Sequence, residues 1–202
     1  MSRPSVHSEA PAGDPLQVFV RWFDEAERAG SLFPDAFALA TATRAGRPSV
    51  RYVLYKGLVE GSLRLVTNFE SRKARELEEN PHAALAFFWP SLGRQVRMEG
   101  TVSRATDEES DRYFAGRDRE TQLGAWASAQ SRPLASRKEL DERFEAASKR
   151  FAGTSVPRPP SWGMLAFRPS SVELWTSGPH RLHDRFLYER EKGGWRVTRL
   201  AP

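Results

Sequence analysis

Cysteine is absent from this chain of 202 residues. The absence excludes a disulfide framework, a thiolate metal site and a cysteine nucleophile, and it fits a reducing compartment. Long apolar runs are also absent: none approaches the roughly 20 residues of a membrane span, and the opening segment has no stretch typical of an export signal. We therefore expect a cytoplasmic protein with no membrane partner.

Motifs for metal binding and nucleophilic catalysis are missing as well. The four histidines form neither an H-x-x-x-H nor an H-E-x-x-H pair. There is no G-x-S-x-G elbow, no G-x-G-x-x-G fingerprint and no G-x-x-x-x-G-K-[ST] loop. The sequence predicts no metal site, and any redox or transfer chemistry would belong to a bound cofactor.

Charge is plentiful but mixed. The net charge is +5, from 31 basic and 26 acidic residues. The basic residues are spread along the chain and form no basic tail or long basic helix, which disfavours nucleic acid and favours phosphorylated small molecules. The 12 Phe, 6 Trp and 4 Tyr indicate a globular protein with a substantial core.

The chain divides into a short arm and one domain. Residues 1–13 are rich in Ser, Pro, Gly and Ala and predict a mobile arm, and residues 14–202 predict a single domain. Asp14 is a candidate N-cap for a helix that begins at Pro15 and ends near Gly30.

The rest of the pattern is mainly β with flanking helices. Four short β-type runs lie between residues 37 and 89, with a helix capped by Ser71 between the third and fourth, and a fifth run covers 94–105. Thr106 and Ser136 open two further helices. Four more runs follow at 163–169, 171–176, 185–191 and 195–200. We predict a mostly antiparallel sheet closing into a barrel, with helices outside it.

Basic residues on a predicted short helix and on one strand could bind anions. Arg72 and Lys73 begin the predicted short helix, where free amides and the helix dipole favour a phosphate. The alternative is that they pair with nearby glutamates on a solvated face. Arg51 and Lys56 fall on opposite faces of a strand and could be ordinary edge cations.

A helical segment offers a second phosphate site. Tyr113 and Arg117 are four residues apart and share a helix face, and Thr121 follows at the same spacing. A partly buried tyrosine beside a surface arginine is the alternative. Near the C-terminus, an extended strand would place Arg181, His183 and Arg185 on one face, which calls for an anionic or electron-rich planar partner.

Nine short motifs in order identify a resemblance. They are R-Y-V-L-Y-K, T-N-F-E-S-R-K-A, N-P, R-Q-V, Y-F-x-x-R, Q-L-G-A-W-A-S-x-Q-S, V-P-R-P-P-x-W-G, R-L-H-D-R and R-L-A-P. Together they resemble the pyridoxamine 5′-phosphate oxidase family over about Asp14 to Pro202. The resemblance implies a homodimer of FMN-binding split β-barrels, with two FMN sites at the subunit interface.

The resemblance also implies the residues of the FMN site. From one subunit these are Arg51, Thr67, Arg72, Lys73 and Gln95, and from the other they are Gln130, Ser131, Trp175 and Arg185. The remainder of the first motif and one strand residue are implied to line the same site, namely Tyr52, Val53, Leu54, Tyr55, Lys56 and Val66.

The implied substrate is pyridoxamine 5′-phosphate or pyridoxine 5′-phosphate. Its phosphate would be bound by Lys56, Tyr113, Arg117 and Thr121, and its ring by Arg181 and His183, which are also the implied catalytic residues. The implied reaction gives pyridoxal 5′-phosphate, with a hydride equivalent passing to the flavin and O2 as acceptor, releasing H2O2.

Two alternatives stay open. The same scaffold could act on another ring, as in the phenazine-pathway relatives, although those tend to lose the substrate-phosphate residues that are present here. The chain could also be a non-catalytic flavin binder.

The sequence departs from the family's usual residues at several positions. Val66 replaces Tyr, Thr121 replaces Ser, Leu174 replaces Phe, and Thr176 and Ser177 replace Gln and Gly. The N-terminal arm lacks the Arg and Tyr pair that often covers the substrate in the family.

Overall fold

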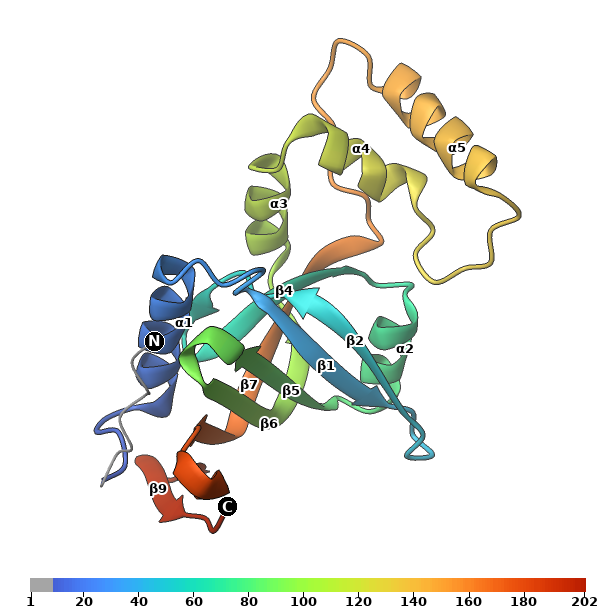
Figure 1. The fold of residues 1–202 in the computed structure, drawn as a ribbon. Coiled ribbons are helices and arrows are strands. Elements are labelled where there is room, and N and C mark those ends of the chain that lie inside the picture. The colour runs from blue at the N-terminus through green and yellow to red at the C-terminus, as the bar shows by residue number, and fades with distance from the viewer. Residues whose placement is uncertain (1–8) are drawn as a thin grey trace.

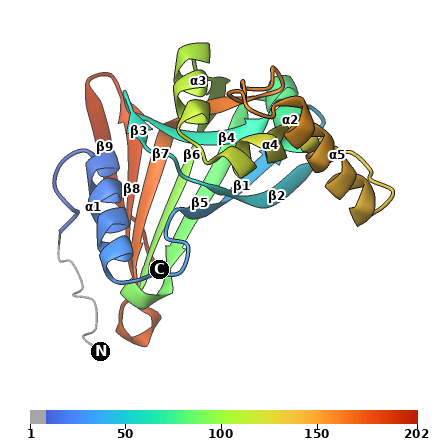
Figure 2. The same ribbon diagram turned by 90° about the horizontal axis from the view of Figure 1, so that it is seen from above.

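The computed structural model describes residues 9–202, which form a nine-stranded sheet with helices around it (Figure 1). The strands are β1 (Ala36–Ala42), β2 (Pro48–Leu54), β3 (Leu58–Val59), β4 (Ser62–Asn68), β5 (His82–Trp89), β6 (Arg94–Arg104), β7 (Trp162–Thr176), β8 (Asp184–Glu191) and β9 (Gly194–Arg199). The helices are α1 (Pro15–Arg28), α2 (Arg72–Glu79), α3 (Asp107–Ala115), α4 (Arg119–Ala127) and α5 (Arg137–Arg150), with 3₁₀ turns η1 (Pro90–Leu92) and η2 (Pro179–Arg181). Figure 2 shows α1 and α5 at opposite sides of the molecule.

The strands pair in antiparallel fashion throughout the described chain. Their order is β2-β1-β5-β6-β7-β4-β3, and β8 pairs with both β7 and β9. The sheet closes because the chain after β2 returns to β4: the Lys56 amide donates to the Arg64 carbonyl and the Arg64 amide to the Gly57 carbonyl, each at 2.8 Å. The predicted antiparallel barrel with flanking helices is confirmed.

The two strands predicted at 163–169 and 171–176 are one continuous strand, β7. The register of β7 with β6 shifts between Glu99 and Gly100, opposite Pro169. A Cβ on Gly100 would lie 2.2 Å from the Arg168 carbonyl oxygen, so only glycine permits this close approach. Because of this bulge, β7 continues past Pro169 instead of ending there.

The predicted helix N-caps are confirmed. Backbone amides of Leu16, Ala74, Glu109 and Glu139 donate to the side chains of Asp14, Ser71, Thr106 and Ser136, respectively. The sequence predicted two helices between β6 and β7, but three are present. Asp118 caps the additional helix, α4, by accepting from the Thr121 amide at 2.8 Å.

Two apolar clusters form the core. The larger one fills the barrel, where the rings of Phe19 and Phe87 lie 4.9 Å apart. The smaller one lies under the helices that follow β6 and is built around Phe114 and Trp162. Tyr113 packs against the edge of this smaller cluster, so the cluster supports the position of the Tyr113 side chain.

The predicted arm of residues 1–13 is described only in part. Residues 1–8 lie outside the described part of the chain. The Pro11 carbonyl accepts a hydrogen bond from the Tyr188 hydroxyl at 2.7 Å, so this segment runs against β8. Within residues 9–202, no helix combines the length and the apolar character needed to cross a membrane.

Candidate functional site

Lys73 lies among neutral acceptors at the start of α2. Its Nζ is 2.8 Å from Gln130 Oε1, 3.0 Å from Thr67 Oγ1 and 3.4 Å from Ser71 Oγ, and the residue is only 9% exposed. Burial, with the nearby charge of Arg51, lowers the pKa of Lys73 to about 8. A buried cation held by neutral groups is suited to an anionic ligand. We call Thr67, Ser71, Lys73 and Gln130 the Lys73 cluster.

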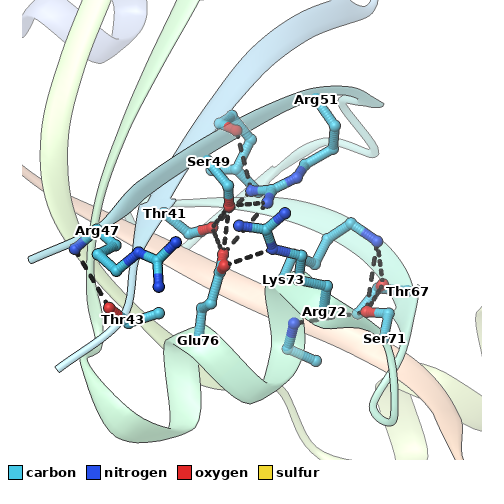
Figure 3. Close-up of polar contacts among 12 residues, drawn as sticks. Thr41, Thr43, Arg47, Ser49, Arg51, Thr67, Ser71, Arg72, Lys73 and Glu76 are labelled. Atoms are coloured by element: carbon cyan, nitrogen blue, oxygen red, sulfur yellow. Dashed lines mark hydrogen bonds and ion pairs between the residues drawn. The ribbon is translucent and has the colours of Figure 1, made fainter. Parts of the chain in front are cut away.

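Glu76 organises the cations beside this cluster. It accepts hydrogen bonds from Ser49 Oγ at 2.5 Å, Arg72 Nε at 2.8 Å and Arg51 Nη2 at 3.3 Å. Burial raises the pKa of Glu76, but the hydrogen bonds from Ser49, Thr41, Arg72 and Arg51 outweigh it and bring the pKa to about 2. Figure 3 shows both guanidinium groups directed at this carboxylate.

The predicted alternative of glutamate pairing therefore holds for Arg72 but not for Lys73. Arg72 has a largely exposed side chain and forms an i,i+4 ion pair with Glu76. Lys73 instead points toward Thr67 and Ser71 (Figure 3). Of the two adjacent cations, Lys73 is the one free of a carboxylate partner among the described residues.

Gln130 reaches Lys73 of its own chain. The resemblance implied that Gln130 and Ser131 come from the second subunit, but the Gln130 amide oxygen also lies 3.2 Å from Thr67 Oγ1 of the same chain. The reason is the loop between α4 and α5, which descends toward α2 (Figure 1). Ser131 in this loop has a left-handed backbone with φ 67°, an unusual conformation for serine.

A cleft of about 770 Å³ lies where β2 and β4 meet α3 and α4. Its lining includes all four residues that were assigned to a substrate phosphate, Lys56, Tyr113, Arg117 and Thr121, together with Leu54 and Val66. These four residues lie near the ends of different elements. The fold therefore brings together, in one cleft, the side chains that the resemblance assigned to the substrate phosphate. Val66 and Thr67 are consecutive on β4 and point to opposite faces, one toward this cleft and the other toward Lys73.

Arg117 is a cation of the cleft with an incompletely bonded guanidinium. Its Nη1 is buried and has no hydrogen-bond partner among the described residues. Its guanidinium lies 4.8 Å from the ring centroid of Trp162, on which the Tyr113 ring also stacks at 6.2 Å. Burial lowers the pKa of Arg117, against the opposing effects of Tyr113 and Asp118. A buried donor without an acceptor calls for an explanation, and a bound anion supplies one.

The remaining residues of the first motif divide between the two faces of β2. Tyr52 and Leu54 are exposed, whereas Val53 and Tyr55 face the core. Burial, with a smaller effect of Asp24, raises the pKa of Tyr55 to about 12. Arg51 and Lys56 meet different carboxylates, Glu76 and Asp35, as expected for opposite faces.

Gln95, Trp175 and Arg185 form a row across β6, β7 and β8, which we call the Trp175 row. Gln95 is paired with Trp175, and Trp175 with Arg185, so the three side chains share one sheet face. Glu173, buried on β7, accepts from Arg185 Nε at 2.9 Å and also pairs with Arg97. Burial raises the pKa of Glu173, but the two guanidinium groups lower it further than burial raises it.

The segment before β8 is a turn, not the extended strand predicted from the sequence. His180 and Arg181 both have left-handed backbones, with φ 55° and 63°. Because the chain turns here, Arg181 and Arg185 do not alternate along one strand. Such conformations cost roughly 1–3 kcal/mol per residue and are typical of binding and catalytic sites.

His183 follows this turn and packs on the Trp175 row. Its ring centroid lies 4.6 Å from that of Trp175. The Gly178 amide donates to His183 Nδ1 at 3.2 Å. A neutral His183 therefore carries its proton on Nε2 and presents that N–H as a donor.

The Lys73 cluster and the Trp175 row lie near opposite ends of β7. Thr67 pairs with Gly163, and Trp175 is twelve positions further along the strand. At about 3.3 Å per residue, this is roughly 40 Å along β7. The resemblance grouped Gln95 with Lys73 in one subunit, but the structure puts Gln95 at the far end of the sheet. One chain cannot bring both groups to a single small molecule.

Comparison with known proteins decides the family. Residues 23–151 match the family described as pyridoxamine 5′-phosphate oxidase, and residues 162–202 match the pyridoxine 5′-phosphate oxidase C-terminal dimerisation region. The chain belongs to the pyridoxamine 5′-phosphate oxidase family. The pyridoxine/pyridoxamine 5′-phosphate oxidase of Rubrobacter xylanophilus is 52% identical over 201 residues, covering 100% of this chain and 93% of that protein. The Burkholderia thailandensis protein of the same name is 48% identical over 204 residues, covering 100% and 95%.

Solved structures agree with this membership in the pyridoxamine 5′-phosphate oxidase family. PhzG from Burkholderia lata, solved with tetrahydrophenazine-1-carboxylic acid, has a TM-score of 0.93 and 31% identity over the full length of both chains. A pyridoxamine 5′-phosphate oxidase-related, FMN-binding protein from Nostoc punctiforme has a TM-score of 0.75 at 19% identity, covering 95% of this chain and 100% of its own, and supports the fold alone. The predicted split-barrel fold is confirmed, the chain is an oxidoreductase of this family, and its dimerisation region supports a homodimer.

Two glutamates of the site were missed by the sequence reasoning. Glu173 lies between buried Val172 and Leu174 on β7, and a carboxylate within such an apolar run was the available signal. Glu76 is, from the sequence, one of the nearby glutamates that could pair with Arg72 and Lys73 on a solvated face, because nothing in the sequence places Thr41 and Ser49 beside it.

Gly178→Ala should disable this family member without unfolding it. A Cβ at Gly178 would lie 1.9 Å from the Leu182 carbonyl oxygen, so the turn that holds Arg181 and His183 must open. A displacement of about 1 Å can reduce turnover by about a hundredfold. Oxidase assays with far-ultraviolet circular dichroism measure both properties.

Gly193→Ala is the matched control for this variant. Unlike Gly178, Gly193 has a left-handed backbone, with φ 91°, and a Cβ there meets nothing within 4 Å. It lies in the β8–β9 hairpin, so stability should fall slightly and turnover should not change. Equal turnover in the Gly178 variant and the wild type would contradict the role given to this turn.

Proposed function

We propose that this protein binds FMN between two subunits and oxidises pyridoxamine 5′-phosphate or pyridoxine 5′-phosphate to pyridoxal 5′-phosphate. O2 is the acceptor and H2O2 the second product. The observation that carries the proposal is Arg117, whose buried Nη1 has no acceptor among residues 9–202 and lies in a cleft shared with Lys56, Tyr113 and Thr121. Guanidinium, ammonium and hydroxyl donors converging on one cleft suit a phosphate monoester.

The residues present also fit a second phosphorylated ligand, the flavin. Lys73 is buried among neutral acceptors beside the start of α2, and this arrangement lowers the energy of an added phosphate. The residues that would hold FMN are Arg51, Thr67, Arg72, Lys73, Gln130 and Ser131 of one subunit and Gln95, Trp175 and Arg185 of the other. The bound flavin supplies the hydride acceptor and the site of reaction with O2.

The chain's own residues orient the substrate. The cleft cations anchor the phosphate, so the substrate ring is fixed against rotation when its other edge meets the second subunit. His183 offers its Nε2–H to a ring substituent, and its position is held by the Gly178 amide and Trp175. In this proposal Arg181, on the strained turn, orients the amine or alcohol and favours loss of its proton.

A homodimer completes the proposed site through one sheet face. Val50, Tyr52 and Phe88 are 68%, 78% and 58% exposed, although all three are large and apolar or aromatic. Cross-strand pairing puts them on the same face as the Trp175 row. We call this surface the open sheet face. Its burial against a second copy would bring the Trp175 row of one subunit to the Lys73 cluster of the other.

A second candidate is a phenazine-type oxidase on the same scaffold. The similarity to PhzG over the full chain favours it, at 31% identity. The cluster of Lys56, Tyr113, Arg117 and Thr121 in the cleft argues for the first candidate, because an unphosphorylated tricyclic acid has no phosphate for these four donors to bind.

An absorbance spectrum followed by anaerobic titration tests the proposed function. Purified protein should be yellow, or become yellow with added FMN, and the flavin band should bleach with pyridoxamine 5′-phosphate. Peroxide release should be much slower with unphosphorylated pyridoxamine. A protein that never binds flavin, or that oxidises both amines equally, would contradict the proposal.

Flavin affinity should depend on pH through Lys73. Its pKa of about 8 in the free protein means that the cation is present below pH 8 and is lost above it. FMN affinity should therefore be constant near pH 7 and fall by up to about tenfold per pH unit above pH 8. Fluorescence titration with FMN measures this, and riboflavin, which has no phosphate, should show no such fall.

A further inference from the structure

Two cations of the cleft differ in how they are neutralised. Lys56 Nζ lies 3.0 Å from Asp35 Oδ2 in a pair that is only about one quarter exposed. Arg117 forms no ion pair among the described residues and has a buried, unbonded nitrogen. An entering phosphate therefore finds Arg117 available, but it must share Lys56 with a carboxylate.

The other acids around the cleft are already used. Glu109 accepts from Arg64 with both of its oxygens, at 3.1 and 3.4 Å. Asp118 caps α4 and accepts from both the amide and the hydroxyl of Thr121. Asp118 also acts electrostatically on Arg117, but neither Glu109 nor Asp118 forms an ion pair at contact distance with a cation assigned to the substrate, which distinguishes Asp35 from them.

Asp35 is also held in place by its backbone. Its carbonyl accepts from the Tyr55 amide at 2.8 Å, and the preceding carbonyl, of Pro34, accepts from Trp89 Nε1 at 3.0 Å. The Lys56 amide is bonded to the Arg64 carbonyl at 2.8 Å. With both backbones fixed, the carboxylate stays beside Lys56 when a ligand enters the cleft.

We propose that Asp35 is a specificity-determining residue that competes with the substrate phosphate for Lys56 and so weakens the hold of the cleft on phosphate monoesters. This inference rests on the proposed function of the cleft. Asp35 touches no substrate atom and acts through Lys56. Because substrate and product both carry the phosphate, a competing carboxylate limits retention of the product as well as of the substrate.

Asp35→Asn tests this directly, since it removes the charge and keeps the shape and backbone bonds. In the FMN-loaded protein, the KM for pyridoxamine 5′-phosphate and the Kd for inorganic phosphate should each fall about tenfold. The KM for unphosphorylated pyridoxamine should not change. A structural role for Asp35 would instead change both substrates together.

A double-mutant cycle identifies the route of the effect. In a Lys56→Met background, Asp35→Asn should give no gain in phosphate affinity, because the shared partner is gone. Glu189→Gln removes the same charge from a pair with Arg196 on the β8–β9 hairpin and should leave phosphate binding unchanged. It thereby controls for net charge.

The outcomes separate the two proposals. Suppose that Lys56→Met weakens phosphate binding but that Asp35→Asn binds phosphate no more tightly than wild type. The role of Asp35 is then wrong, and the proposal that the cleft binds the substrate phosphate is unaffected. If wild type and Lys56→Met bind phosphate and pyridoxamine 5′-phosphate equally, Lys56 does not bind the phosphate and the role of Asp35 is wrong. If wild type also oxidises phosphorylated and unphosphorylated pyridoxamine equally, the cleft is no phosphate site, and both proposals are overturned.

Discussion

Lys73→Met should give a protein that is purified without flavin. Lys73 is the buried cation that has only neutral acceptors, so a phosphate bound there gains a strong charge-assisted hydrogen bond. Such a bond is worth about 1.5–3 kcal/mol, and its loss should weaken FMN binding about 10- to 150-fold. The ratio of flavin to protein absorbance, with a fluorescence titration of the apoprotein, measures the change.

The same variant should leave the apoprotein at least as stable as the wild type. Burial opposes the charged form of Lys73, as its lowered pKa indicates, and methionine removes that charge while keeping the length of the side chain. Thermal unfolding of both apoproteins checks this. Flavin loss with undiminished stability separates a binding role from a folding role.

Arg72→Ala is the matched control from the adjacent position. Its side chain is 61% exposed and already paired with Glu76, so FMN affinity should fall much less than in the Lys73 variant. Nothing in the sequence ranks these two neighbours as phosphate ligands. If the Arg72 change proves equal to or larger than the Lys73 change, the flavin phosphate is not bound by the Lys73 cluster.

Local chemistry explains which features could be predicted from the sequence. The caps at Asp14, Ser71 and Thr106 depend on residues within three positions of each other, and all formed as predicted. Tyr113, Arg117 and Thr121 meet in one cleft as predicted, but they do not share one helix face: Tyr113 is in α3, Thr121 is in α4, and Arg117 lies between the two helices. The antiparallel barrel follows from short alternating runs.

The errors arise where distant contacts decide the structure. The continuity of β7 depends on Gly100 of another strand, which admits the backbone beside Pro169. The turn at Arg181 depends on contacts between Gly178 and the segment that follows. Strand alternation predicts neither, because a local pattern does not report left-handed backbones at non-glycine residues.

The single chain also groups two site residues differently from what the family resemblance implied. Gln130 lies beside Lys73, because the α4–α5 loop folds toward α2, and Gln95 lies at the far end of the sheet beside Trp175. The separation of roughly 40 Å along β7 follows from strand pairing, which the sequence does not contain. The same pairing puts apolar side chains on the open sheet face beside the Trp175 row.

Val50→Asp should therefore produce a monomer that no longer retains flavin. Val50 lies on the open sheet face and is 68% exposed in the single chain. In a two-fold symmetric dimer each substitution occurs twice, so two unpaired carboxylates would be buried, at a cost of several kcal/mol. Analytical ultracentrifugation measures the mass, and absorbance measures the bound flavin.

Leu32→Asp is the control that makes this result specific. Leu32 is 85% exposed but lies between α1 and β1, outside the sheet. The same charge placed there should leave both the dimer and its flavin intact. If the Val50 variant is monomeric yet keeps flavin, one chain suffices for the cofactor, and the Trp175 row has no part in holding it. If the variant stays dimeric, the subunits meet through another surface, because a carboxylate pair buried at a two-fold interface would not be tolerated.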